Sequence, residues 1–369
     1  MAYDPFSRGP LPVGVRSFEV KDPSRERTLP VEFWYPASDA HAGQDLDEAT
    51  QDQYAPMPMA PEVAQAAVRD AAPRADAARP ALVVFSHGYG GERRQTTHFC
   101  THLASHGYAV ASMDHVGNTM ADTFQAVMDS QSGATMPDPA EAIARFIDDR
   151  PADASFVIDR VLAGDAAVDV DAERIGITGH SFGGWTTLQT TGRDRRVRAA
   201  LPLAPAGGSS QLNEAAGAGN PLRDRLSLDW GRQVPTLYLV AEFDTLLPLD
   251  GMRELIARTP PPCRAVVLRN SDHFHFCDRV EQTHDLFKSM APLMASSGAA
   301  AGVDVSGLFD SMKSSAELCP GEHAYAMIQG LGLAHMDAHL RGDAAAAALL
   351  GGDLAALLGE RGIDAEGIG

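Results

Sequence analysis

The chain has 369 residues, of which 44% are hydrophobic, and this is enough apolar material for a large buried core. Lys and Arg number 30 against 49 Asp and Glu, so the formal net charge is −19. A surface this negative repels phosphate backbones and anionic lipids, which disfavours nucleic-acid binding and polybasic docking to membranes. None of the three lysines, Lys21, Lys288 and Lys313, lies in a glycine-rich loop, so no phosphate-cradling motif is present.

The four cysteines are too few and too irregularly spaced for a disulfide scaffold: Cys100, Cys263, Cys277 and Cys319. The N-terminus lacks the basic region followed by an apolar stretch that marks a secretory signal. No run approaches the roughly 18 consecutive apolar residues of a membrane span. We therefore expect a cytoplasmic protein without a membrane span, and the sequence leaves its oligomeric state open.

Two short runs with strand character come first, at residues 15–20 and 31–34, and each is closed by a turn signal. They predict an antiparallel edge of a sheet. Residues 37–80 are rich in Ala, Pro, Asp and Gln, which predicts a surface insertion with one helical piece near residues 61–72. The apolar run 81–86 then leads towards glycine, as in strands that are buried on both faces of a parallel sheet.

From residue 96 onward, helix-like and strand-like segments alternate along the chain. Helices are predicted over residues 96–106, 183–191 and 252–257, with residues 156–162 inside another helix, and strands over residues 108–113, 174–178, 199–203, 237–240 and 265–268. This alternation is typical of a parallel sheet with right-handed crossovers.

The tail from about residue 306 is predicted to be helical, with segments 344–350 and 354–358 packed on the body of the protein. No internal repeat is visible, and no linker separates two domains. We therefore predict one α/β domain over residues 1–369. It has a mostly parallel central sheet with an antiparallel N-terminal edge, helices on both faces, and loop or lid inserts at about residues 37–80, 116–149 and 206–233.

The strongest local motif is the hexapeptide GHSFGG at residues 179–184, which follows a predicted strand and opens a predicted helix. In this context Ser181 lies on a sharp strand-to-helix turn, with the helix N-terminus directed at its oxygen. Glycines two residues before and after it let the neighbouring backbones pass without a Cβ clash. The motif predicts that Ser181 is a nucleophile; the alternative is a turn serine without chemistry.

A serine hydroxyl is a weak nucleophile, so a base and an orienting acid have to accompany it. With this kind of turn they follow in the order Ser, acid, His, each after a later strand. Asp244 follows the predicted strand 237–240, and His273 follows the predicted strand 265–268. Asp244 would fix the tautomer of the His273 ring, which leaves the other ring nitrogen to take the Ser181 proton.

Rival residues lie near both of these positions. Glu242 and Asp250 are alternatives for the acid, and His275 is the alternative for the base. A metal site on His273 and His275 is a third interpretation, but no third ligand with suitable spacing accompanies them. We predict that the protein needs neither a metal nor an organic cofactor.

The glycine-rich segment FSHGYGG at residues 85–91 follows the central apolar strand. In serine hydrolases of this architecture, a turn at this place contributes one backbone N–H to the oxyanion hole, and the residue after the nucleophile contributes the other. The two predicted donors are the amides of Tyr89 and Phe182.

The same segment has a second interpretation as a dinucleotide-binding turn. A strand, Gly88 and Gly90 resemble the start of such a turn, and Asp114 ends the next strand, where a ribose-binding acid would lie. However, Arg93 stands at the third glycine position, and this interpretation leaves Ser181 without a role.

Through its motifs at residues 84–91, 179–184 and 270–276, the chain resembles the α/β-hydrolase superfamily. More narrowly, it resembles plasma-type platelet-activating-factor acetylhydrolases and dienelactone-hydrolase-like esterases over roughly residues 10–345, mainly in strand order. Dienelactone hydrolases proper carry a cysteine nucleophile. The acetylhydrolases carry their acid after the earlier strand, where this chain reads LAP at residues 203–205. Polyester-degrading cutinases are a looser match, since they favour methionine where Phe182 stands.

The resemblance implies a serine carboxylic-ester hydrolase that acts on short to medium acyl esters of small molecules through an acyl-enzyme. Phospholipid acetylhydrolases, lipases and polyesterases use the same triad, as do thioesterases, acyltransferases and peptidases, and a non-catalytic binding protein of this fold is the alternative outside enzymes. His180, Trp185 and His275 are candidates for substrate contacts. Residues 116–149 and 206–233 are interpreted either as a lid over the pocket or as ordinary connections.

Overall fold

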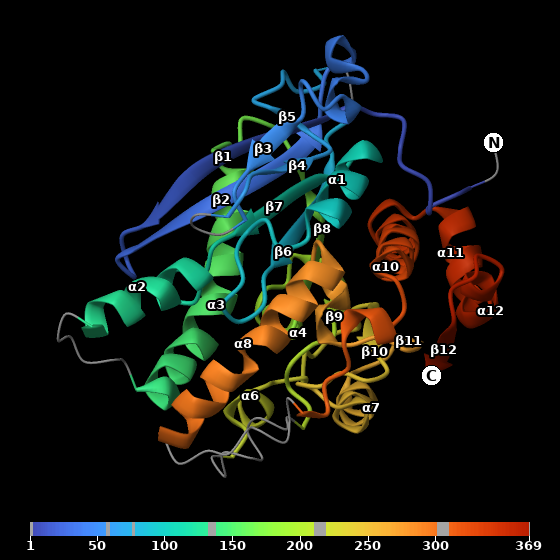
Figure 1. The fold of residues 1–369 in the computed structure, drawn as a ribbon. Coiled ribbons are helices and arrows are strands. Elements are labelled where there is room, and N and C mark those ends of the chain that lie inside the picture. Colours follow the sequence, from blue (N-terminus) through green and yellow to red (C-terminus); the bar gives the residue numbers. More distant parts are fainter. Residues whose placement is uncertain are drawn as a thin grey trace.

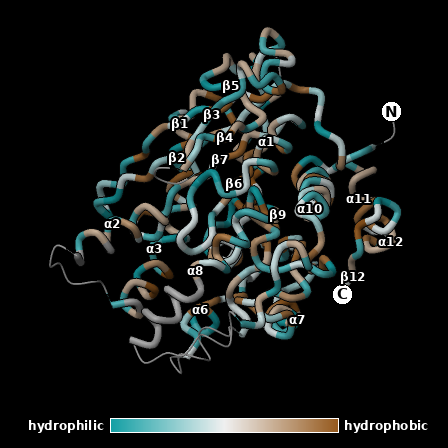
Figure 2. Tube along the Cα trace, in the orientation of Figure 1, coloured by the Kyte–Doolittle hydropathy of each residue, from teal (hydrophilic) through white to brown (hydrophobic). Residues whose placement is uncertain are grey.

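The computed structural model describes residues 3–56, 60–75, 78–131, 138–209, 219–300 and 310–368. In these ranges the chain forms a ten-stranded mixed sheet with the strand order β12-β11-β10-β9-β8-β6-β7-β2-β1-β5 (Figure 1). Hydrophobic residues are concentrated along the central strands (Figure 2).

The strands from β7 through β6, β8, β9 and β10 to β11 run parallel to one another. Their bounds are β6 Ala81–Ser86, β7 Ala109–Met113, β8 Asp171–His180, β9 Val197–Leu203, β10 Thr236–Ala241 and β11 Cys263–Leu268. All residues of β6, β7 and β10 are buried, as expected for strands that helices cover on both faces. The predicted parallel core is confirmed.

Antiparallel strands lie at both ends of the parallel core. β1 (Val13–Asp22) pairs with β2 (Arg27–Pro36), and β2 pairs antiparallel with β7, so the predicted N-terminal edge is confirmed. β5 (Val68–Arg69) extends this edge beyond β1. At the other end, β12 (Ala365–Ile368) pairs with β11; the sequence analysis did not predict it, because four residues show no periodicity.

The prediction of a helical piece near residues 61–72 is wrong. This part of the insertion contains β4 (Val63–Gln65), which pairs with β3 (Asp52–Tyr54), and the strand β5. Tertiary contacts override the local helix signal here. The Gln65 amide oxygen accepts a hydrogen bond from the buried Trp34 indole at 2.7 Å, and its amide nitrogen donates to Asp52 at 2.6 Å.

Helices cover both faces of the sheet, as predicted. One face packs against α1 (Thr97–Ser105), α10 (Gly321–Met336), α11 (Ala344–Gly351) and α12 (Leu354–Gly359). The other packs against α3 (Pro139–Leu162), α4 (Phe182–Arg193) and α7 (Leu249–Arg258). Leu350, Leu354 and Leu358 are buried in the first of these layers, which confirms that the tail packs on the body (Figure 1).

The remaining helices include α2 (Met120–Gln131), α6 (Pro221–Asp224) and α8 (Val280–Ala300). Short 3-10 or π turns occur at Asp39–His41, Gln44–Leu46, His273–Phe276, Ser315–Glu317 and Asp337–Arg341. Within the described ranges, none of the helices combines the length and the apolarity needed to cross a membrane.

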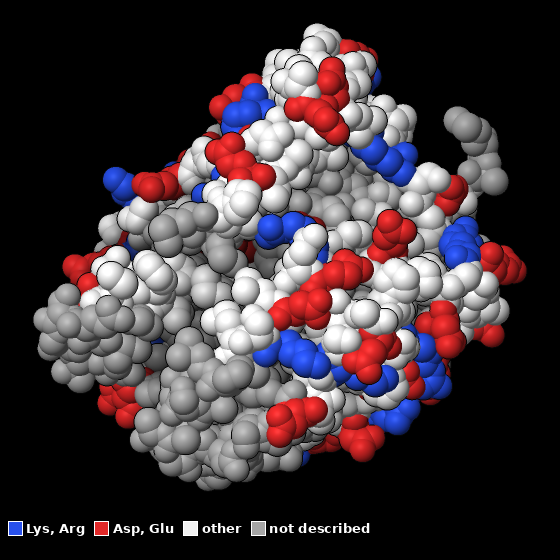
Figure 3. Space-filling model, viewed as in Figure 1, with Lys and Arg blue, Asp and Glu red and all other residues white. Residues whose placement is uncertain are grey.

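Basic side chains on the face seen in Figure 3 lie beside acidic ones. Arginine–carboxylate pairs occur at several places on the protein, for example between Arg93 and Asp114 and, at 2.6 Å, between Arg223 and Glu254. These pairs neutralise arginines locally in a chain whose net charge is −19.

Candidate active site

The residues predicted as nucleophile, acid and base follow three strands of the parallel core. Ser181 directly follows β8, Asp244 follows β10, and His273 begins the 3-10 helix after β11. Carboxyl ends of parallel strands meet at one edge of a sheet, where α/β proteins place their ligand sites. Ser181 and His273 accordingly line the same pocket.

Ser181 lies on a tight, strained turn. It has φ 59° and ψ −118° and is the N-cap residue of α4. A non-glycine residue in such a conformation costs on the order of 1–3 kcal/mol and persists only where the surrounding structure imposes it. A Cβ on Gly183 would lie 1.8 Å from the Ser86 carbonyl oxygen, and one on Gly179 would lie 2.5 Å from the Gly183 oxygen. Backbone packing therefore requires both flanking glycines of the motif.

Asp244 and His273 are both buried and hydrogen-bonded to each other, with 2.8 Å between His273 Nδ1 and Asp244 Oδ2. The other Asp244 oxygen accepts the amides of Leu246 and Leu247 at 3.0 and 2.7 Å. Burial raises the pKa of Asp244, and the adjacent His273 ring opposes that rise. When Nδ1–H is donated to Asp244, Nε2 of His273 is the nitrogen that can accept a proton.

The rival acids are engaged elsewhere or face solvent. Glu242 accepts a hydrogen bond from the Arg269 guanidinium at 2.6 Å and one from the Asn270 amide at 2.7 Å. The side chain of Asp250 is 96% exposed. Among the described residues, neither carboxylate is hydrogen-bonded to the His273 ring, which is bonded to Asp244 instead.

The rival base, His275, has both ring nitrogens occupied. Nδ1 accepts the Asp272 amide at 3.1 Å, and Nε2 donates to the Cys319 carbonyl oxygen at 3.0 Å. Burial lowers the pKa of His275, in keeping with a neutral ring. In the part of the chain that the structure describes, no group of three or more His, Cys, Asp or Glu side chains is placed to hold a metal ion.

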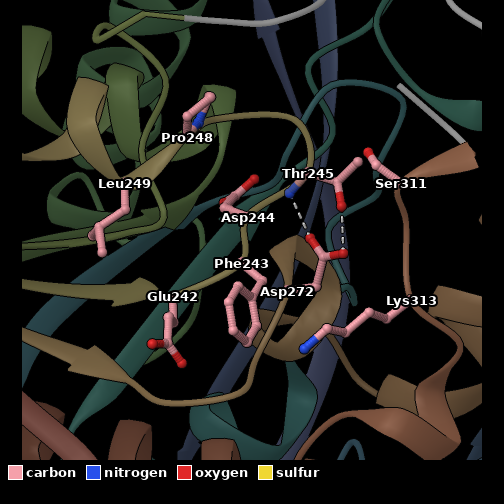
Figure 4. A pocket seen from close by; sticks show the side chains of 9 residues that line it. All are labelled: Glu242, Phe243, Asp244, Thr245, Pro248, Leu249, Asp272, Ser311 and Lys313. Carbon is pink, nitrogen blue, oxygen red and sulfur yellow. Dashed lines mark hydrogen bonds between the residues drawn. The ribbon is translucent and has the colours of Figure 1, made fainter. Parts of the chain in front are cut away.

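A second buried carboxylate, Asp272, connects two loops (Figure 4). One is the acid loop, which follows β10 and carries Asp244, and the other is the base loop, which follows β11 and carries His273. Its oxygens accept the His273 amide at 2.6 Å, the Thr245 amide at 2.7 Å and the Thr245 hydroxyl at 2.6 Å. Thr245 directly follows Asp244, so these bonds fix the spacing between acid and base. The sequence analysis assigned Asp272 no role; its position as N-cap of the turn that contains His273 is the signal that could have identified it.

His180, predicted as a substrate contact, lines the pocket and also supports the base. Its Nε2 donates to the His273 carbonyl oxygen at 3.0 Å, and its Nδ1 accepts from the Gln95 amide at 2.9 Å. Gln95 in turn accepts the Gly88 amide at 2.8 Å, which connects the base loop to the glycine-rich loop. Burial lowers the pKa of His180 well below its ordinary value, so its ring is neutral at pH 7.

The amides predicted to form the oxyanion hole are available at the pocket. Tyr89 and Phe182 line it together with Ser181. No hydrogen bond between described residues uses the amide of Tyr89 or of Phe182 as its donor. In contrast, the neighbouring amides of Gly88 and Gly90 donate to Gln95 and to the Asn118 carbonyl oxygen. Within the described residues, both amides are thus left for the oxyanion hole that the sequence predicts.

The pocket has a volume of about 440 Å³ and draws apolar side chains from the predicted inserts. Met120 comes from α2, Ile143 from α3 and Leu222 from α6, and α8 adds Phe287. Segments of the predicted inserts 116–149 and 206–233 therefore line the pocket.

Trp185 and His275 are not among the described residues that line this pocket. The Trp185 ring is buried, and its indole N–H donates to the Leu222 carbonyl oxygen at 2.7 Å. Trp185 therefore holds the backbone of Leu222, whose residue lines the pocket. The His275 ring is turned towards Cys319. The structure thus places His180 alone of the three predicted substrate contacts at the pocket surface.

The carboxyl group of Glu92 is expected to make the stability of the folded protein depend on pH. It lines the pocket, where burial and the nearby Asp114 raise its pKa to about 8 against an opposing effect of Arg93 and Arg94. The folded protein therefore binds a proton that the unfolded chain has released, and stability falls as the pH rises from about 4.5 to about 8. We expect Glu92→Gln to be more stable than wild type by about 1–3 kcal/mol at pH 8 and nearly equal at pH 5.

Thermal unfolding at the two pH values checks this expectation. Glu173→Gln is the matched control, because its side chain is 81% exposed. A stability difference between Glu92→Gln and wild type that stays the same at pH 5 and pH 8 would contradict the assignment of the raised pKa to Glu92.

A solved structure identifies the class of fold. The ferulic acid esterase from Streptomyces cinnamoneus is 25% identical in sequence to this chain and matches it with a TM-score of 0.60, over 90% of this chain and 91% of that chain. The chain has the α/β-hydrolase fold, as its motifs predicted.

Similar sequences belong to ester hydrolases. The family model described as platelet-activating factor acetylhydrolase, isoform II, matches residues 25–158. The platelet-activating factor acetylhydrolase of Cavia porcellus is 29% identical over 150 residues, 34% of either chain. The cutinase est1 of Thermobifida alba is 27% identical over 196 residues, 52% of this chain and 53% of the cutinase. The chain spans about a third to a half of the length of these curated relatives.

These matches confirm the resemblance that the sequence motifs indicated. The match to the acetylhydrolase family ends at residue 158, before Ser181. The assignment of nucleophile, acid and base therefore depends on the geometry of the site.

Proposed function

We propose that this protein is a serine carboxylic-ester hydrolase that works through an acyl-enzyme. The observation that carries the proposal is that Ser181, on its strained turn, lines the same pocket as His273, whose ring is hydrogen-bonded to the buried Asp244. The similarity to an acetylhydrolase, a cutinase and a ferulic acid esterase supports the same chemistry.

In the proposed mechanism, Ser181 attacks the ester carbonyl while His273 Nε2 takes its proton, and Asp244 stabilises the imidazolium that forms. The amides of Tyr89 and Phe182 donate hydrogen bonds to the oxyanion. His273 then gives the proton to the leaving alcohol as the carbonyl re-forms. In the second half, His273 activates a water that releases the acid from the acyl-enzyme.

For substrate size we propose esters with short to medium acyl chains. A pocket of about 440 Å³ lies in the lower part of the range of about 300–1,000 Å³ that small-molecule sites occupy. Its lining is apolar at Met120, Ile143 and Leu222, which suits an alkyl or aryl group. The alternatives with the same triad are a phospholipid acetylhydrolase, a lipase or a polyesterase. The acetylhydrolase and cutinase names of the relatives favour the first and the last of these.

Hydrolysis of p-nitrophenyl esters from acetyl through palmitoyl tests the substrate proposal. We expect the highest kcat/KM between acetyl and octanoyl and a value at least about tenfold lower for palmitoyl, because the longest chain leaves apolar surface outside the pocket. A maximum at palmitoyl would favour a lipase instead. A protein that hydrolyses none of the esters and is not labelled by a small phosphonate would be a binding protein.

A further inference from the structure

Arg150, on α3, is a fully buried arginine with an unusual set of partners. Its Nε donates to the Thr186 hydroxyl at 3.1 Å, its Nη1 donates to the Asn118 side-chain oxygen, and its Nη2 donates to the His87 carbonyl oxygen. Among the ion pairs of the described residues, none involves Arg150. The buried Asp153 carboxylate attracts this charge, but it is paired with Arg25 and Arg27 and not with Arg150. A buried charge without a directly paired carboxylate is costly, so stability alone does not explain an arginine at this position.

These partners lie on both sides of the first oxyanion donor. The His87 carbonyl, which Arg150 holds, is two residues before Tyr89. One residue after Tyr89, the Gly90 amide donates to the Asn118 carbonyl oxygen at 3.2 Å, and Arg150 holds the side chain of the same asparagine. The guanidinium thus contacts the loop on both sides of Tyr89, directly at His87 and through Asn118 at Gly90.

The same guanidinium also contacts the segment of the second donor. Arg150 Cζ lies 4.5 Å from the centroid of the Phe182 ring. Thr186, which accepts the Arg150 Nε–H, donates its hydroxyl to the Phe182 carbonyl oxygen at 2.9 Å. One side chain therefore connects the two backbone segments whose amides have to converge on a single oxygen.

We propose that Arg150 is a positioning residue of the oxyanion site, which aligns the Tyr89 and Phe182 amides and places a positive charge beside their segments. This inference rests on the proposed esterase function, since an oxyanion forms only when Ser181 attacks a carbonyl. Negative charge that develops in the transition state offsets the cost of the buried cation. The charge is therefore worth more in the transition state than in the free enzyme, which is the condition for accelerating the reaction.

Arg150→Met, Arg150→Lys and the control Arg160→Met test the inference. Arg160 lies on the same helix, with its side chain 40% exposed and paired to Asp165 at 2.7 Å. For Arg150→Met we expect kcat to fall about 100-fold, the effect of losing one oxyanion donor, with KM changed less than about threefold. Arg150→Lys should lose about tenfold, since lysine keeps the charge but not the planar fork. Arg160→Met should match wild type.

A pair of inhibitors separates an effect on the oxyanion from a general loosening of the pocket. A trifluoromethyl ketone is attacked by Ser181, whose proton passes to His273, so its carbonyl oxygen becomes an oxyanion; the matching methyl ketone binds without that step. We expect Ki for the trifluoromethyl ketone to rise about 100-fold in Arg150→Met and Ki for the methyl ketone to change less than about threefold. Equal changes for both ketones would overturn the inference.

The outcomes also distinguish this inference from the proposed function. A wild-type protein without esterase activity would overturn both. An active wild type together with an equally active, folded Arg150→Met variant would overturn the role of Arg150 alone. If Arg150→Met does not fold, Arg150→Lys decides, because an unchanged kcat and an unchanged ratio of the two Ki values in that variant would overturn the inference.

Discussion

The Ser181→Ala variant is expected to hydrolyse p-nitrophenyl butyrate with a kcat lowered about 10⁴-fold or more, while KM changes little. The substitution removes the oxygen that attacks the carbonyl, but it leaves the pocket in place, with Tyr89 and Phe182 in its lining. Residual turnover should come from binding and the oxyanion site alone. Initial rates for the wild type and the variant, measured with the same ester series, check this expectation.

The geometry of the turn supplies the control for this variant. Because residue 181 has a φ of 59°, alanine retains the backbone strain and glycine relieves it. We expect Ser181→Gly to be as inactive as Ser181→Ala but more stable by about 1 kcal/mol, as measured by thermal unfolding. If either variant kept a tenth of the wild-type kcat, Ser181 would not be the nucleophile.

For Asp244→Asn we expect kcat to fall about 10³- to 10⁴-fold at pH 7. The asparagine amide can donate to His273 Nδ1, which stabilises the tautomer with its proton on Nε2, where the Ser181 proton has to be received. The volume of the side chain is kept, and its oxygen can still accept the Leu246 and Leu247 amides. The variant should therefore fold normally, with its loss concentrated in the chemical step.

Glu242→Gln is the matched control for this prediction. Glu242 directly follows the same strand, β10, but its carboxylate accepts hydrogen bonds from Arg269 and from the Asn270 amide. We expect its kcat to stay within about twofold of wild type. If kcat fell strongly in Glu242→Gln and stayed normal in Asp244→Asn, Glu242 and not Asp244 would be the acid that orients His273.

The features of this protein that could be predicted from the sequence are those determined by residues close to one another in the chain. The turn at Ser181 depends on glycines two residues away, and the apolar strand runs are long enough to show that they are buried. Acid and base could be placed after particular strands, but the sequence left Glu242 and His275 as rivals. Only contacts with Arg269 and Cys319 in the folded chain show that those rivals are occupied.

The parts that could not be predicted depend on contacts between distant segments. Gln95 and His180 are 85 residues apart, and Arg150 and His87 are 63 apart, so no periodicity or spacing signals either hydrogen bond. Trp185 directly follows the glycines of the serine motif, and from the sequence it could either pack against the helix or contact the substrate. The turn of α4 instead directs its indole N–H to Leu222.

The two edges of the sheet are both short: β5 has two residues, and β12 has four. A long, free edge strand presents unpaired N–H and C=O groups on which a strand from another molecule can add. β12 covers β11 from Ala265 to Leu268, the strand that leads to His273. β11 therefore presents no free edge to another molecule along these residues, so edge-to-edge aggregation cannot begin on the strand that leads to the catalytic base.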